Sequence, residues 1–318
     1  MELAPTVLAP MVLAPMALAK FAKDAEGGDG FDPAEKYQMV PLQDQRRMVV
    51  KRSLIGPGPG AAQVALKIES PDIVELADFD TPAPLRLSAG EMLLPQVPAI
   101  NFKIRGLQEG TVRLLLVNKQ TGKTIDTLTA TVKKGLVKKY FIIRLVDLHH
   151  APLRSTVDTT GKLVWASSVY LSTTNVAFQK FGEAPITVQD NLGDPLDFGG
   201  TAPLNPSKTI LQLIVDATPD AVKMNPELFF VLYQVWNLRG DSPLNGVTFS
   251  GGRFNFIFIE DDALLTTYAH EIGHAFGLSP KNRHDRDPLN IMSSPGTNNR
   301  FRFRRSQIDT INPSGVKK

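Results

Sequence analysis

Three of the five histidines of this 318-residue chain fall within one short window, at His270, His274 and His284. His270 and His274 are four residues apart, so on an α-helix they are about 40° apart in rotation and share a face. Two imidazoles on one face suit a single divalent metal ion, and Glu271 beside the first could take a proton from a water there. The segment 270–274 therefore predicts a helix that carries a zinc centre, and the remaining fold has to support that helix.

The composition narrows the chemistry of such a site. The chain has no cysteine, which excludes disulfides, thiolate metal ligands and a cysteine nucleophile. A net charge of +3 and a hydrophobic content of 42% are typical of a soluble globular protein, and they do not imply a polyanionic partner.

The sequence after the helix limits the third metal ligand. Gly277 supplies the left-handed conformation that ends a helix and turns the chain back toward the metal. No glutamate follows Glu271, so a later glutamate cannot complete the site. The conventional ligands that remain downstream are His284, Asp285, Asp287 and Asp309. Histidine is the preferred zinc ligand among these types.

The run from His270 to Leu278, followed by His284-Asp285 and by Asn290-Ile291-Met292, resembles the extended zinc signature and Met-turn of the metzincin metallopeptidases. The family's third histidine lies six residues after the second, where this chain has Pro280. His284 lies ten residues after His274, so the segment Ser279–Arg283 carries an insertion.

The resemblance implies a role for each matched residue. Zinc would be held by His270, His274 and His284, with Asp285 as the alternative third ligand, since some relatives use aspartate there. Glu271 would be the general base, and Met292 would form the hydrophobic floor beneath the ligands. Ser294 stands where some relatives have an additional tyrosine ligand, so no such tyrosine is expected.

We expect an α+β fold in three segments. Residues 1–60 read as a low-complexity, flexible leader and residues 61–160 as a β-rich accessory or pro-domain. Residues 161–318 read as a metzincin-like zinc peptidase domain with a twisted mixed sheet, helices and a small C-terminal subdomain. The middle segment could be a pro-domain that covers the cleft or a targeting module. Alternation predicts its strands, an antiparallel set, at Ala99–Arg105, Thr111–Asn118, Thr124–Val132 and Val137–Val146.

In the last segment the patterns are mixed. Helices are expected at Leu163–Phe181 and Arg305–Ile311, and the pair Asp261-Asp262 is expected to cap the histidine helix. Strands are expected at Pro185–Val188, Ile210–Val215 and Arg253–Glu260. The apolar run Pro226–Leu238 suits either a buried helix or a buried strand.

The N-terminus repeats a Leu-Ala-Pro pentapeptide, with prolines at Pro5, Pro10 and Pro15. It lacks the basic start of a signal peptide, and its prolines would interrupt a membrane-spanning helix. We expect an extended leader on a secreted or exported protein, without a recognisable signal peptide or stable membrane span. An export or packaging apparatus that reads this leader is a further candidate partner.

Three weaker sequence signals are better explained by ordinary structural roles than by binding sites. The acidic loop Asp190–Gly200 could bind a structural Ca²⁺, but a polar surface loop is favoured. The strip Arg300–Arg305 alternates basic and aromatic residues; an edge strand with a solvated basic face is favoured over nucleic-acid binding. His149-His150 reads as a surface or packing pair.

The sequence thus predicts a zinc-dependent endopeptidase that hydrolyses peptide bonds of a protein or peptide substrate. A metal-activated water would attack, with Glu271 as its general base. The alternative is a non-catalytic, metal-containing structural or delivered effector protein.

Overall fold

The computed structural model describes most of the chain after the N-terminal repeat: residues 18–22, 29–53, 63–80, 82–147, 159–201, 204–238, 245–251, 254–278, 285–293 and 300–316. The prolines of the repeat, His149-His150, Pro280, His284 and Ser294 lie outside the described residues.

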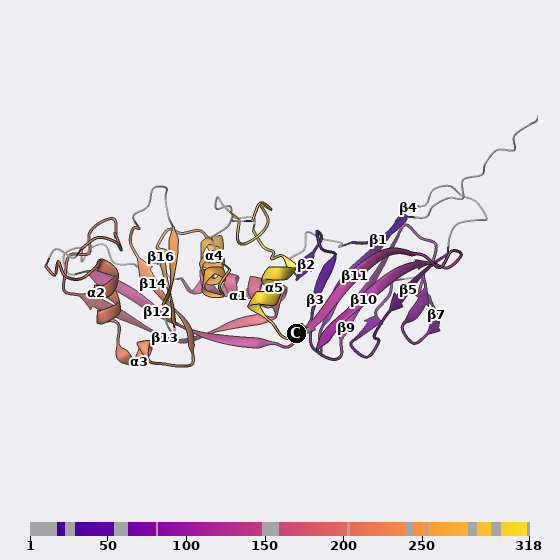
Figure 1. Ribbon diagram of the computed structural model, residues 1–318, viewed down its shortest axis with the longest axis horizontal. Coiled ribbons are helices and arrows are strands. Elements are labelled where there is room, and N and C mark those ends of the chain that lie inside the picture. Colours follow the sequence, from indigo (N-terminus) through magenta and orange to yellow (C-terminus); the bar gives the residue numbers. More distant parts are fainter. Residues whose placement is uncertain are drawn as a thin grey trace, which may run out of the picture.

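Two sheets built from residues 18–133 form a β-sandwich (Figure 1). The four-stranded sheet is antiparallel, in the order β1 (Leu18–Ala22), β4 (Gln45–Ser53), β9 (Ala99–Gly106), β6 (Val74–Ala77). The seven-stranded sheet has the order β2 (Phe31–Asp32), β3 (Tyr37–Pro41), β11 (Thr124–Lys133), β10 (Gly110–Asn118), β5 (Val64–Ile68), β8 (Glu91–Leu93), β7 (Leu85–Ser88). Its strands are antiparallel except for the parallel pair β3–β11.

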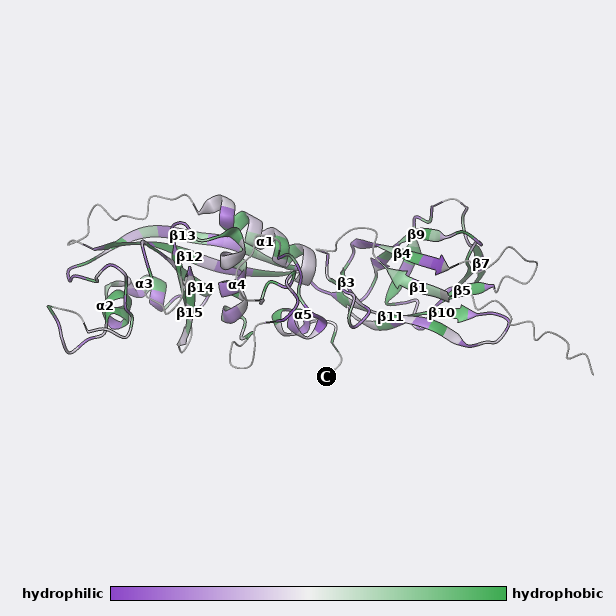
Figure 2. Ribbon diagram, turned by 90° about the horizontal axis from the view of Figure 1, so that it is seen from above, coloured by the Kyte–Doolittle hydropathy of each residue, from purple (hydrophilic) through white to green (hydrophobic). Residues whose placement is uncertain are grey.

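The alternation of side chains explains how these sheets pack. Along β9, Ile100, Phe102 and Ile104 are buried while the residues between them are more exposed, and β10 alternates in the same way. Figure 2 shows hydrophobic bands along the sandwich strands, and their buried members form one core between the two sheets. The expected strands at 99–132 are confirmed. Residues 18–22 and 31–53, which belong to the expected flexible leader 1–60, instead supply β1, β2, β3 and β4.

A five-stranded mixed sheet forms the second half of the molecule, in the order β13 (Val176–Val188), β12 (Leu136–Asp147), β14 (Leu228–Val235), β16 (Phe254–Glu260), β15 (Gly246–Gly251). The strands are parallel except for β15, which is antiparallel to β16 and lies at the edge. The strand expected at Val137–Val146 is β12, so it pairs in this sheet and not in the sandwich. The mixed sheet with helices confirms the α+β class.

Helices cover both faces of this sheet. One face packs against α1 (Thr160–Thr174), α4 (Leu265–Ala275) and α5 (Arg305–Ile311), and the other against α2 (Ile210–Ala217) and the short α3 (Asp220–Lys223). The central strand β14 is therefore buried along almost its whole length, with Phe230 and Leu232 in one core and Val231 and Tyr233 in the other.

Two sequence predictions in this half are wrong. The helix expected to reach Phe181 ends at Thr174, because Asn175 adopts a left-handed conformation (φ +57°) and the chain continues as β13. The strand expected at Ile210–Val215 is helix α2. Its start is fixed by a capping box, in which Gln212 N donates to Thr209 Oγ1 (3.2 Å) and Thr209 N to Gln212 Oε1 (3.0 Å). The helix expected at Arg305–Ile311 is confirmed.

A buried polar junction joins the sandwich to the second half. Lys133, at the end of β11, is fully buried and forms an ion pair with Asp309 of α5 (2.9 Å). Its Nζ also donates to the carbonyls of Asn312 (2.6 Å) and Ser314 (3.1 Å). Asn312 in turn donates to the carbonyl of Thr174 (2.8 Å), at the end of α1. The segment after α5 therefore ties the two halves together.

Replacing Lys133 by methionine is expected to lower the free energy of unfolding by about 2–4 kcal/mol, because it leaves the carbonyls of Asn312 and Ser314 without this donor and removes the buried cation paired with Asp309. Urea denaturation followed by circular dichroism measures this change. Lys134→Met is the matched control, because the Lys134 side chain is exposed and should change stability by less than about 0.5 kcal/mol. Equal stabilities for the two variants would show that the junction contributes little.

Candidate metal centre

The histidine helix α4 begins at Leu265, after Leu264 as N-cap. The expected capping by Asp261-Asp262 is therefore wrong, and no side chain caps this helix. The backbone of this pair has another role: Asp261 N donates to the Val235 carbonyl (3.1 Å), which holds the turn after β16 against the end of β14.

The end of α4 is formed as predicted. Gly277 adopts φ +83°. Gly277 N donates to the His274 carbonyl (2.8 Å), and Leu278 N donates to the Gly273 carbonyl (3.1 Å). These two hydrogen bonds define a Schellman motif, in which a left-handed glycine closes the helix. The chain turns away directly after the second histidine.

His270 and His274 converge on one point. Their Nε2 atoms are 3.1 Å apart, and their rings are almost perpendicular. Two nitrogens bound to one tetrahedral zinc at about 2.0–2.1 Å each would be about 3.3 Å apart. Among the residues that the structure describes, His270, Glu271 and His274 are the one group of such side chains with ligand atoms close enough to share an ion.

The backbone fixes which ring nitrogens can bind a metal. His270 Nδ1 lies 2.9 Å from the Ile291 carbonyl, and His274 Nδ1 lies 2.7 Å from the Leu278 carbonyl. A carbonyl only accepts, so these two contacts favour hydrogen on both Nδ1 atoms and lone pairs on both Nε2 atoms; Arg300 Nη1, which only donates, also lies 3.3 Å from His270 Nδ1. Two lone pairs facing each other across 3.1 Å repel unless a cation lies between them. Burial also lowers the pKa of His274, which favours its neutral form. The donor set thus fits a metal such as zinc.

Glu271 is buried beside this pair. Thr248 of β15 contacts both its carboxylate (Oγ1 to Oε2, 2.7 Å) and its carbonyl (3.0 Å). Burial raises the pKa of Glu271 to about 7, and the Thr248 hydrogen bond partly opposes this rise. Gly246 lies so close that an added Cβ would be 2.8 Å from Glu271 Cγ. The edge strand therefore packs directly against the candidate base.

Met292 lies beneath the histidine helix. It is 5% exposed, and a Cβ added to Gly273 would lie 2.4 Å from its Sδ, so glycine at that position lets the two approach. The hydroxyl of Tyr170 from α1 donates to the carbonyl of Ala269 (2.8 Å) and supports the helix from the same side. Met292 therefore packs against α4 at Gly273, between the positions of the two histidines.

The alternative third ligand, Asp285, is already engaged. Its carboxylate forms an ion pair with Arg304 and accepts from Arg304 Nη2 (2.8 Å) and Asp287 N (2.9 Å). Burial acts to raise the pKa of Asp285, but the Arg304 hydrogen bonds outweigh it, and the net shift is downward. Asp285 is absent from the group of described side chains that converges with His270.

The basic strip does not form the expected edge strand with a solvated face. Residues 300–304 make one isolated bridge, between Asn290 and Arg302, and α5 begins at Arg305. Arg300 is buried, Arg302 pairs with Asp287 (2.7 Å), Arg304 with Asp285, and Arg305 with Asp309 (3.7 Å). These arginines organise the segment below the metal centre.

The carboxylates of the acidic loop at 190–200 accept hydrogen bonds from other groups of the protein. Asp190 Oδ1 accepts from Asn191 N (2.7 Å) and Leu204 N (3.1 Å), and Asp197 Oδ1 accepts from Gly199 N (3.1 Å). No second cluster of metal-ligating side chains occurs within the described ranges, and the suggested Ca²⁺ site gains no support from them.

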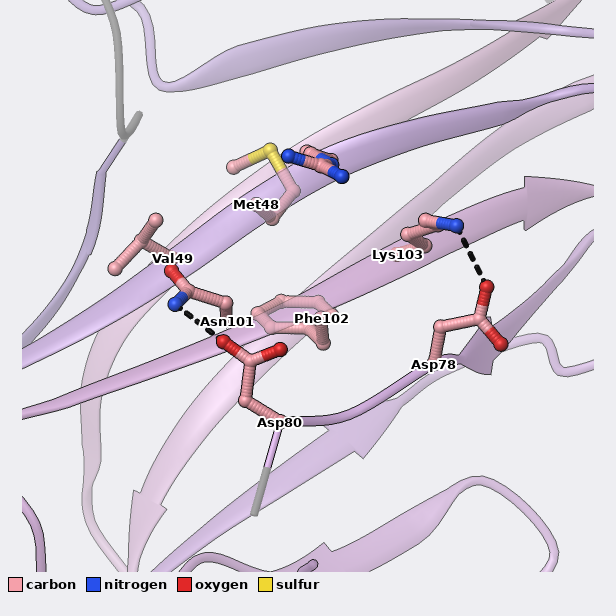
Figure 3. Close-up of a pocket in the computed structure, with 8 residues that line it drawn as sticks. Met48, Val49, Asp78, Asp80, Asn101, Phe102 and Lys103 are labelled. Atoms are coloured by element: carbon pink, nitrogen blue, oxygen red, sulfur yellow. Dashed lines mark hydrogen bonds and ion pairs between the residues drawn. The ribbon is translucent and has the colours of Figure 1, made fainter.

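A separate hollow lies on the four-stranded sheet of the sandwich (Figure 3). Met48 and Phe102 are among its lining residues, as are the pairs Lys103–Asp78 (2.7 Å) and Asn101–Asp80 (2.5 Å). Its polar groups satisfy one another, and none of its lining residues comes from the histidine helix.

Sequence reasoning missed two residues of the site, Thr248 and Arg300. Thr248 lies in an alternating segment that could have been read as the hairpin partner of the strand at 254–260. No pattern in the sequence distinguishes the buried Arg300 from the other arginines of its strip.

No family model matches this sequence, and no curated protein is similar to it. Comparison with solved structures finds weak likenesses. One is to the surface layer protein SbsC, domains 1–6, with 10% identity and a TM-score of 0.23 over 31% of this chain and 12% of that one. Another is to FdeC, an Escherichia coli adhesin, with 8% identity and a TM-score of 0.21 over 38% and 32%. The chain thus spans well under two thirds of these neighbours.

Within the described part of the chain, no helix has the length and apolar character needed to cross a membrane.

Proposed function

We propose that this protein is a zinc-dependent endopeptidase of the metzincin type. The observation that carries the proposal is the convergence of the His270 and His274 Nε2 atoms at 3.1 Å, with both Nδ1 atoms committed to backbone carbonyls. A single metal ion can accept both of these nitrogen lone pairs. His284 would be the third ligand.

The neighbouring residues support hydrolysis. When bound, zinc would polarise the scissile carbonyl and make a water more acidic. The Glu271 carboxylate, oriented by Thr248, would take a proton from the attacking water and later give it to the leaving amine. A buried carboxylate with a pKa of about 7 is well matched to this exchange near neutral pH.

The arrangement around the helix also supports the metzincin comparison. The antiparallel edge strand β15 pairs with β16 on one side and packs on α4 through Gly246 and Thr248. An extended substrate could add to the other edge of β15, which would place its backbone beside Glu271. Met292 beneath Gly273 matches the floor that the family's Met-turn provides.

The proposal is tested by metal analysis of the full chain combined with cleavage of an unbiased peptide library. We expect one zinc per chain, and library cleavage that stops when a chelator removes the metal and returns when zinc is restored. Stoichiometric zinc without cleavage of any library member would favour the non-catalytic alternative. A chain that binds no zinc would overturn the proposal itself.

A further inference from the structure

Strand β3 of the sandwich takes part in both cores of the molecule. Val40 belongs to the core between the two sandwich sheets. Tyr37 and Met39, with 0% of their surface exposed, belong instead to the core of the second half, in the cluster that contains Met292 and Ile308. Without β3 this cluster would lose two large side chains and expose apolar surface to water, which is unfavourable. Part of the core of the second half is therefore supplied by the sandwich.

Polar contacts surround this shared core, and each of them joins the sandwich to α1 or α5. They are the Asp32 carboxylate with Arg305 N (2.9 Å), the Tyr37 hydroxyl with Asp309 (3.4 Å) and the Arg46 guanidinium with the Ser172 carbonyl (3.1 Å). Asp309 also pairs with the buried Lys133, so it contacts two sandwich residues. Buried side chains with paired polar groups distinguish this interface from the more polar contacts of domains that move apart.

Helix α5 connects this interface to the candidate metal centre. Asn290 is buried, and its Nδ2 donates to Gln307 Oε1 of α5 (2.8 Å). Its Oδ1 accepts from Met292 N (2.8 Å), and Met292 packs against Gly273 of α4. Loss of the sandwich would remove the groups that hold α5, and so loosen the segment that packs on the histidine helix.

The sandwich lies away from the proposed substrate edge. In Figure 1, α4 and α5 lie between the sandwich and β16, and in Figure 2, α4 lies between the sandwich and β15. The contacts described above fall on α1, α5 and the segment after α5. The described part of the sandwich therefore does not cover the edge of β15 beside Glu271.

We propose that the β-sandwich is a permanent part of the catalytic unit: it completes the core beside the metal centre, and the protein acts with the sandwich attached. It is not a pro-domain whose removal activates the enzyme. The shared core is independent of what the second half does, whereas the statement about activation rests on the proposed function.

The first test measures how far the second half depends on the sandwich. Both tryptophans of the chain, Trp165 and Trp236, lie in the second half, so tryptophan fluorescence follows the unfolding of that half. Met39→Ala changes only the sandwich strand β3, yet it should lower the urea midpoint of this fluorescence by about 0.5–1 M. Met39→Leu should restore most of the loss, because leucine has nearly the volume of methionine.

Met224→Ala is the matched control for this test. Met224 lies in the second half itself but is 66% exposed, so its midpoint should stay within about 0.2 M of the wild-type value. A wild-type midpoint in Met39→Ala would overturn the inference, because the second half would then be stable without that side chain.

The second test asks whether the sandwich can be removed. One stretch of chain, Lys134-Gly135 between β11 and β12, joins the two halves, and a recognition site for a sequence-specific protease is inserted there. After the cut, the two fragments should elute together in gel filtration, keep the native tryptophan fluorescence and cleave library peptides as fast as the uncut chain. The uncut insertion variant is the control, and it should unfold at the wild-type urea midpoint.

Two results of the second test would overturn the inference. One is a second half that separates from the sandwich and keeps its native fluorescence and zinc. The other is peptidase activity that appears only after the sandwich has been removed. If the fragments stay together but neither they nor the uncut chain cleaves any peptide, the proposed function is wrong and the shared core stands.

Discussion

Replacing Glu271 by glutamine is expected to lower peptidase activity by at least about two orders of magnitude while the zinc content stays that of the wild type. Glutamine keeps the shape of the side chain and can still accept from Thr248, but its amide cannot take a proton at neutral pH. His270 and His274 keep their carbonyl partners, so metal binding should persist. Measuring kcat/KM on a peptide found in the library screen, with zinc determined on the same sample, separates the two effects.

Glu260→Gln is the matched control for this substitution. Glu260 is the last residue of β16 and is also buried. Its carboxylate accepts a hydrogen bond from the backbone N–H of Leu238, away from the histidine pair. The control should keep its activity within a few fold. Full activity in Glu271→Gln would remove Glu271 from the mechanism, and loss of zinc in that variant would show that the carboxylate helps to hold the metal.

Truncating His284 to alanine should weaken zinc binding at least about 100-fold, more than the loss of an outer hydrogen bond would. Asp285→Asn should keep zinc affinity within about tenfold, because the Asp285 carboxylate is already bound by Arg304. Its effect should fall on stability, through the weakened ion pair. Chelator competition and urea denaturation of both variants give the two quantities separately.

The pair of substitutions also decides between the two candidate ligands. If Asp285→Asn removes zinc and His284→Ala does not, Asp285 must leave Arg304 when metal binds, and the assignment of His284 is wrong. If both remove zinc, the Arg304–Asp285 pair is needed to place His284. Arg304→Met would then reproduce the effect of Asp285→Asn.

The histidine helix was predictable because its signals are local. The four-residue spacing of His270 and His274 places both on one face, and Gly277 ends the helix through its own backbone. The strands of the sandwich were predictable for a similar reason: the alternation along β9 and β10 reflects one buried and one more exposed face.

The predictions failed where long-range packing decides the structure. β14 is buried on both faces, so it shows no period that could separate a strand from a helix. The alternation of residues along Leu136–Asp147 does not indicate which sheet this strand joins, because that depends on its parallel partners β13 and β14. Thr248 and Arg300 belong to the site only because the edge strand and the segment after the Met-turn fold onto α4.

The junction at Lys133 has a consequence for the order of folding. The carbonyls that receive its ammonium group belong to Asn312 and Ser314, almost 180 residues later in the chain. A ribosome must therefore have made the chain through Ser314 before this lysine can be buried with its partners, although the sandwich strands are complete much earlier. During synthesis the sandwich could form first, and the second half of the molecule would dock on it last. A nascent chain would thus lack the completed junction between its two halves until the segment after α5 has emerged.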